Sequence, residues 1–130
     1  MNNENNTNFA NIWIADEIVH VEFTCEHYTE AMVDEAIKQR LKITKDGIYP
    51  MLSYLQNFKS ATKGAKQRII QNDAAYGTKA VAVLINSKVQ KVIYNFFVLF
   101  YKAPTPIKMF TNKEKALDWL NQYKTTQLFF

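Results

Sequence analysis

The stretch AVAVLINSKVQKVIYNFFVLFYKAPTPIKMF, residues 80–110, decides the fold class. It opens with six consecutive apolar residues, the pattern of a buried strand. A turn at Asn86-Ser87 leads into a very apolar helical pattern, which must stop at Pro104 and Pro106, and a second short strand pattern covers residues 107–110. The stretch therefore predicts one β-α-β crossover, which carries much of the apolar side-chain volume of the chain.

Outward from this crossover, strand and helix patterns alternate. Two runs of alternating apolar residues, 9–15 and 18–24, flank a short polar break and predict a hairpin. One further strand pattern covers residues 48–55. Three amphipathic helix patterns cover residues 30–45, residues 63–76 and a segment after Thr111. A threonine suited to an N-cap precedes each of these helices. Together they predict an α/β domain with a mixed sheet of about five strands and about four helices.

Length and charge narrow the class of protein. The 130 residues suffice for one domain, expected over residues 9–130, and the polar residues 1–8 are expected to be a disordered terminus. The net charge of +4 comes from 16 basic residues that are interleaved with 12 acids, whereas a nucleic-acid interface usually gathers its bases on one face. Neither a signal peptide nor an apolar run long enough to span a membrane is present, which predicts a cytoplasmic protein without a membrane span or a nucleic-acid partner.

Few residues carry a pattern that is typical of catalysis. The three glycines, Gly47, Gly64 and Gly77, cannot form a Gly-rich phosphate loop. Cys25 and His27 are two residues apart, but no second group of ligands accompanies them, so we interpret them as a small buried thiol beside a solvent-facing imidazole. The sequence predicts a protein that is not an enzyme, without catalytic residues, metal or cofactor.

The helix pattern between residues 87 and 103 is apolar on nearly all sides, which predicts burial on nearly all sides. One stripe fits a core face: Val89, Val92, Ile93, Phe96 and Phe100. The second apolar side is formed by Tyr94, Phe97, Val98 and Tyr101. Three interpretations of this second side stay open: cover by the last helix or by Leu128-Phe129-Phe130, a homodimer interface, or the lining of a site for an apolar ligand.

The loop before the second predicted helix is a candidate anion site. Ser60, Thr62 and Lys63 lie where a strand passes into a helix N-terminus, and the backbone N–H groups there favour an anion or a phosphorylated hydroxyl. The alternative is structural, with Thr62 as the N-cap and Ser60 as an ordinary loop residue.

Several segments together resemble a known superfamily: AVAVLINS at residues 80–87, NFF at 95–97, KAPTPIKMFT at 102–111 and ALDWL at 116–120, with Ala65 and Arg68 in the second helix. Over residues 9–123 the chain is similar to an uncharacterised bacterial branch of the STAS-like (anti-sigma-factor antagonist-like) proteins, whose fold is related to that of CRAL-TRIO lipid-binding domains. The resemblance implies this fold and a non-enzymatic domain that contacts other proteins.

In the antagonist proteins, a partner kinase phosphorylates a Ser or Thr at the start of the second helix, and an Asp lies just before it. Here Asn57 stands near the position of that Asp, and Ser60 and Thr62 lie near the position of the hydroxyl. Our leading hypothesis is therefore a regulatory domain that binds protein partners and forms a homodimer through Tyr94, Phe97, Val98 and Tyr101. The alternative is a carrier or sensor of an apolar small molecule.

Overall fold

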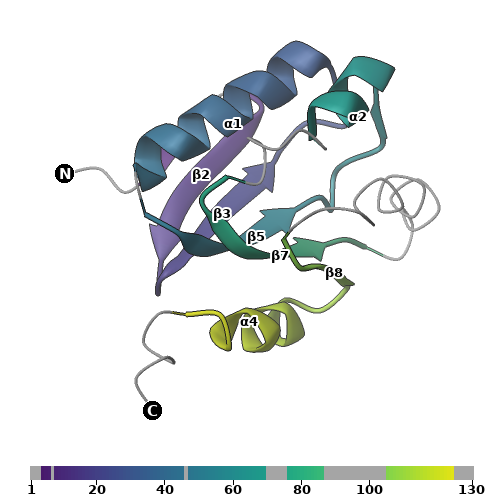
Figure 1. Ribbon diagram of the computed structural model, residues 1–130. Helices are drawn as coiled ribbons and strands as arrows, with labels where there is room; N and C mark the ends of the chain where they lie inside the picture. The colour runs from purple at the N-terminus through teal and green to yellow at the C-terminus, as the bar shows by residue number, and fades with distance from the viewer. Residues whose placement is uncertain (1–3, 7, 46, 70–75, 87–104, 125–130) are drawn as a thin grey trace.

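The computed structural model describes residues 4–6, 8–45, 47–69, 76–86 and 105–124. They form a six-stranded sheet, a separate two-stranded sheet and helices on both faces of the larger sheet (Figure 1). The elements are, in chain order, β1 (Glu4–Asn6), β2 (Ala10–Ala15), β3 (Ile18–Phe23), β4 (His27–Tyr28), α1 (Glu30–Thr44), β5 (Tyr49–Tyr54), β6 (Ser60–Ala61), α2 (Lys63–Ile69), β7 (Thr78–Leu84), β8 (Ile107–Phe110) and α4 (Lys113–Asn121).

The larger sheet is mixed, with strand order β1-β2-β3-β5-β7-β8. The first three strands pair antiparallel, whereas β3, β5, β7 and β8 run parallel. β2 and β3 form the predicted hairpin, and its two turn residues, Asp16 (φ 52°) and Glu17 (φ 64°), have the positive φ angles that a tight two-residue turn requires. The predicted fold class is confirmed, because all five predicted strands are present as β2, β3, β5, β7 and β8.

Helices α1 and α2 lie on one face of the sheet and α4 lies on the other (Figure 1); we call these the α1/α2 face and the α4 face. Because side chains alternate along a strand, β7 supplies both cores. Val81 and Val83 pack with α1 and α2, while Ala80, Ala82 and Leu84 pack with α4. A strand buried on both faces must be apolar throughout, which explains the uninterrupted apolar run at its end.

The predicted N-caps are confirmed for two helices and wrong for the third. Thr29 and Thr62 accept hydrogen bonds from the backbone N–H groups of Met32 and Ala65. We predicted Thr111 as the cap of the last helix, but α4 begins one residue later, and the side chain of Asn112 accepts the bond from the Lys115 N–H. Asparagine caps a helix at least as well as threonine, so the local pattern could not choose between the two neighbours.

Pro50 lies second in β5, an interior strand, although proline cannot donate a ladder hydrogen bond. The ladder between β3 and β5 begins only at Met51, and the register between β5 and β7 shifts between Tyr49 and Pro50. The proline thus occupies an irregularity at the start of the strand, where a missing ladder donor is tolerated.

Two features differ from the sequence analysis. Residues 4–6 pair with β2, so the expected disorder of residues 1–8 is wrong for these three residues; a strand edge is completed by backbone hydrogen bonds and needs no apolar side chain. The short parallel sheet of β4 and β6 was not predicted at all. The apolar helix predicted between residues 87 and 103 and the segment Leu128-Phe129-Phe130 lie outside the described residues.

Candidate functional site

The β4–β6 sheet joins two loops that leave the carboxyl ends of β3 and β5. The Glu26 carbonyl accepts hydrogen bonds from the backbone N–H groups of Lys59 (2.7 Å) and Ser60 (3.0 Å), and the Tyr28 carbonyl accepts one from Thr62 (2.9 Å). In α/β proteins, residues outside the carboxyl ends of parallel strands are the usual binding positions. We therefore take these two loops as the candidate site.

Aromatic packing fixes the base of both loops. The Tyr28 ring is buried, stacks on Phe58 with centroids 5.9 Å apart, and meets Phe23 edge-on at 5.3 Å. Its hydroxyl donates to the Phe9 carbonyl (2.7 Å) and accepts from the Cys25 N–H (2.9 Å), and burial raises the pKa of Tyr28 to about 12. The phenol therefore stays protonated and holds the first loop against the start of β2.

Two side-chain pairs connect the loops at the surface. The Nδ1 atom of His27 lies 2.6 Å from the Ser60 hydroxyl, and both residues are exposed. Beside them the Lys59 ammonium lies 2.7 Å from the Glu26 carboxylate, and this hydrogen bond holds the pKa of Glu26 below its usual range. The site thus presents a hydroxyl, an imidazole and an ion pair to solvent.

The three residues of the predicted anion site have different roles here. The Thr62 hydroxyl is engaged as the N-cap of α2, 3.1 Å from the Ala65 nitrogen. The Ser60 side chain is exposed and meets His27, and Lys63 is the exposed first residue of α2. Ser60 and Thr62 are both exposed, but only the Thr62 hydroxyl caps a helix. The sequence could not pair Ser60 with His27, because the two residues are 33 positions apart and no local pattern joins them.

Cys25 and His27 do not face one another as a catalytic pair would. The His27 ring is directed to Ser60, while the Cys25 sulfur lies 3.9 Å from the Asn8 carbonyl oxygen. His27 is exposed, as predicted, but Cys25 is partly exposed rather than buried. Among the described residues, no three His, Cys, Asp or Glu side chains are placed to share a metal ion. The predicted interface residues Tyr94, Phe97, Val98 and Tyr101 lie outside the described part of the chain.

None of the helices in the described ranges is long and apolar enough to cross a membrane. The fold resembles that of solved structures. One of these is an uncharacterised protein of the DUF3478 family from Shewanella loihica PV-4, described as having a SpoIIAA-like fold. The match has a TM-score of 0.64 at 16% sequence identity and covers 85% of this chain and 91% of that protein. This similarity confirms the STAS-like fold, the fold of the anti-sigma-factor antagonists, and at this identity it shows the fold alone.

No curated protein matches the chain. A family model described as a domain of unknown function, DUF7793, matches residues 12–124, which include every described strand and helix except β1 and part of β2. The chain therefore belongs to the DUF7793 family.

Proposed function

We propose that this chain is a non-enzymatic regulatory domain of the bacterial cytoplasm, that it acts through contact with protein partners, and that it forms a homodimer. Its SpoIIAA-like fold supports this proposal. The observation that carries it is the exposed Ser60–His27 pair, which the β4–β6 sheet holds at the surface above the stacked rings of Tyr28 and Phe58. Exposed polar loop residues that a packed scaffold positions are common in recognition.

At this site, Ser60, Thr62 and Lys63 form the proposed anion or phosphoryl site. A phosphoryl group on Ser60 would lie next to the His27 imidazole. Lys59, which pairs with Glu26, directly precedes Ser60 in the chain, and Lys63 lies three residues after it. Lysine ammonium groups strengthen hydrogen bonds to phosphate oxygens. Thr62 contributes its backbone at the start of α2, because its hydroxyl is already used as a cap.

The anion site can be tested by titrating the full-length protein with inorganic phosphate and following backbone amide chemical shifts. We expect saturable shifts of the Ser60, Thr62 and Lys63 amides, weakened in the His27→Gln variant. Lys38→Gln, on the outer side of α1, is the matched control and should bind phosphate as the wild type does. Unchanged amide shifts of these three residues at millimolar phosphate would refute the anion site.

The homodimer requires a separate test, because the proposed interface residues Tyr94, Phe97, Val98 and Tyr101 lie outside the described residues. Light scattering of the full-length protein should give twice the chain mass of 15.1 kDa. Tyr94→Glu and Val98→Glu should each convert the dimer into a folded monomer, since a buried unpaired charge opposes association. A dimer mass that persists in both variants would rule out this interface. A native mass spectrum of the same sample would reveal a bound small molecule, as the apolar-ligand alternative requires.

A further inference from the structure

Three rings from three neighbouring strands stack on the α4 face. They are Trp13 of β2, His20 of β3 and Tyr54 of β5. The imidazole of His20 lies nearly parallel to the indole of Trp13, with centroids 4.8 Å apart and 5° between the planes. Tyr54 lies 5.8 Å from the His20 ring and 5.7 Å from the Trp13 ring. Only 6% of the His20 surface is exposed, so its imidazole is removed from water.

A buried hydrogen bond joins two rings of this stack. The His20 Nδ1 atom lies 2.8 Å from the Tyr54 hydroxyl oxygen. Burial raises the pKa of Tyr54, so its phenol keeps its proton. The phenol can donate to an unprotonated Nδ1, with the ring proton of His20 on Nε2, or accept from the Nδ1–H of the other tautomer. Burial, and secondarily the charge of Lys113, lowers the pKa of His20 to about 4. Near neutral pH the stack is therefore uncharged at its centre.

The charged groups around the ring come from the facing helix and from the sheet. Lys113 is the first residue of α4, and its ammonium lies 5.4 Å from the centre of the Tyr54 ring. The N-terminus of a helix also carries partial positive charge. On the sheet, Glu22 is the register partner of Tyr54, but its carboxylate already accepts a hydrogen bond of 3.1 Å from Asn11. The Trp13 face attracts cations and offsets part of the repulsion.

We propose that the packing of α4 on the sheet depends on the protonation state of His20, and that protonation of its ring loosens the N-terminal end of α4 from the sheet. A protonated Nδ1 would donate, so the Tyr54 hydroxyl would have to accept. The new charge would be buried opposite Lys113 and the positive end of α4. Because the α1/α2 face contains neither His20 nor Lys113, its helices would keep their packing at the pH that releases α4.

The test is a nuclear magnetic resonance titration of the full-length protein from about pH 7 to about pH 3.5. The His20 ring signals should titrate with a midpoint near pH 4, and the amides of Lys115 and Leu117 should shift with the same midpoint. The amides of Val33 and Ile37 in α1 should remain unchanged at that pH. A His20 midpoint near the ordinary 6.5, or α1 and α4 changing together, would overturn the proposal.

Three variants sharpen the test. His20→Gln, which can still accept the Tyr54 proton, should abolish the separate α4 transition, whereas His27→Gln, at the exposed histidine, should leave it intact. Lys113→Gln removes the facing cation and should move the His20 midpoint to higher pH. If His20→Gln does not fold, the His20 titration midpoint in Lys113→Gln tests the proposal instead. An unchanged midpoint in that variant would contradict the coupling between His20 and α4.

Discussion

The two faces of the sheet are held in different ways. On the α1/α2 face, α1 alone buries five residues, and polar bonds tie the helices to their neighbours: the Arg40 guanidinium donates to the Tyr76 carbonyl (2.9 Å), and Arg68 pairs with Asp34 (3.0 Å). On the α4 face, α4 buries only Ala116 and Leu120. Of the described elements, those on the α1/α2 face thus form the larger core.

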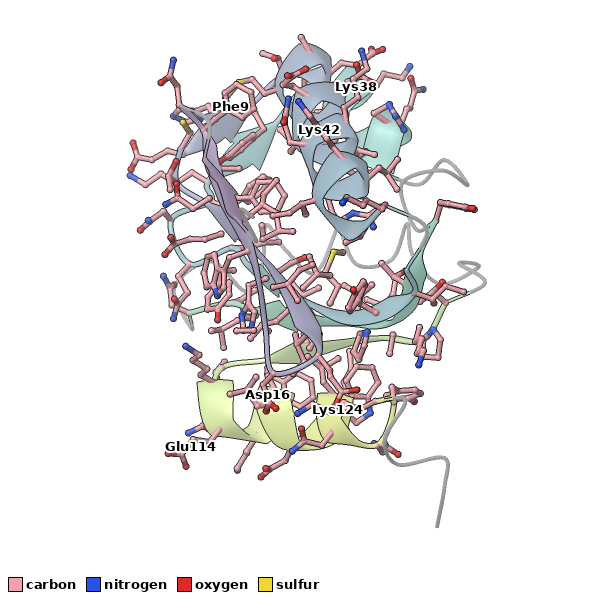
Figure 2. The ribbon with its side chains drawn as sticks, turned by 90° about the vertical axis from the view of Figure 1, so that its left-hand side faces the viewer. Phe9, Asp16, Lys38, Lys42, Glu114 and Lys124 are labelled. Atoms are coloured by element: carbon pink, nitrogen blue, oxygen red, sulfur yellow. The ribbon has the colours of Figure 1, made fainter. Side chains whose placement is uncertain are left out.

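Charged side chains make contacts at both ends of α4, in addition to the aromatic packing of Trp119 and Tyr123 near its end. At its start Lys113 lies over the Tyr54 ring, and just beyond its end the buried Lys124 ammonium lies 2.7 Å from the Asp16 carboxylate of the β2–β3 turn. Figure 2 shows Asp16 and Lys124 side by side at α4, far from Lys38 and Lys42 on α1. The comparison teaches that the α1/α2 face has the larger described core, whereas α4 combines a small buried core with polar contacts at its two ends.

Truncation of Leu120 should have the largest effect. Its side chain is fully buried and is one of the two buried residues of α4, so Leu120→Ala should lower the free energy of unfolding by about 3 kcal/mol. Chemical denaturation measures this loss. Leu117→Ala, at a partly buried neighbour, is the matched control and should cost clearly less. Equal losses in both variants would mean that Leu120 does not anchor the helix.

Removal of the Arg68 guanidinium should destabilise the α1/α2 face, because the nearly buried Arg68 pairs with Asp34; the loss is limited, since Asp34 keeps Lys38 and water as partners. The same ion pairs hold the pKa of Asp34 below its ordinary 3.8. Their contribution is therefore present above that pH and is lost as the pH falls through the lowered pKa. Denaturation of Arg68→Met at about pH 7 and at low pH should show the smaller loss in acid. A loss independent of pH would point to packing of the Arg68 stem instead.

Neutralisation of Asp16 tests the ion pair between Asp16 and Lys124 at the end of α4. Asp16→Asn keeps a residue that tolerates the positive φ angle, so the variant changes charge and little else. We expect a loss of about 1 kcal/mol, since Lys124 is buried but Asp16 is largely exposed and water can replace it. High salt should weaken the wild type more than the variant. A variant as stable as the wild type at low salt would show that the pair does not hold α4.

The smallest effect is expected at Ser60 of the candidate site. Thr62→Ala should cost about 1 kcal/mol through the lost N-cap, while Ser60→Ala should be nearly neutral because its hydroxyl caps no helix and meets only the exposed His27. Thermal denaturation of the two variants separates the capping hydroxyl from the one that caps no helix. A large loss in Ser60→Ala would mean that the His27–Ser60 pair is part of the fold rather than of a recognition surface.

Local patterns predicted much of the fold. The apolar run of β7, the hairpin of β2 and β3 and the caps Thr29 and Thr62 are each encoded within a few neighbouring residues. The choice of Asn112 over Thr111 depended on where the chain leaves β8, which short-range preference does not determine.

The candidate site and the ring stack could not be predicted, because they depend on the order of strands. Ser60 meets His27, and Tyr54 meets His20, only because the chain places β5 beside β3 in parallel register. Each pair is separated by more than thirty residues, and neither strand carries a periodic signal for its partner's side chain.

The most direct test of the contrast between the two faces is amide hydrogen exchange of the full-length protein near neutral pH. If the α1/α2 face is the stable core, amides at Ala36 and Ile37 in α1 should exchange at least about tenfold more slowly than those at Leu117 and Leu120 in α4. Asp16→Asn should accelerate exchange in α4 and leave α1 unchanged. Equal protection of both helices, lost together in the variant, would contradict the account and show that the faces unfold as one unit.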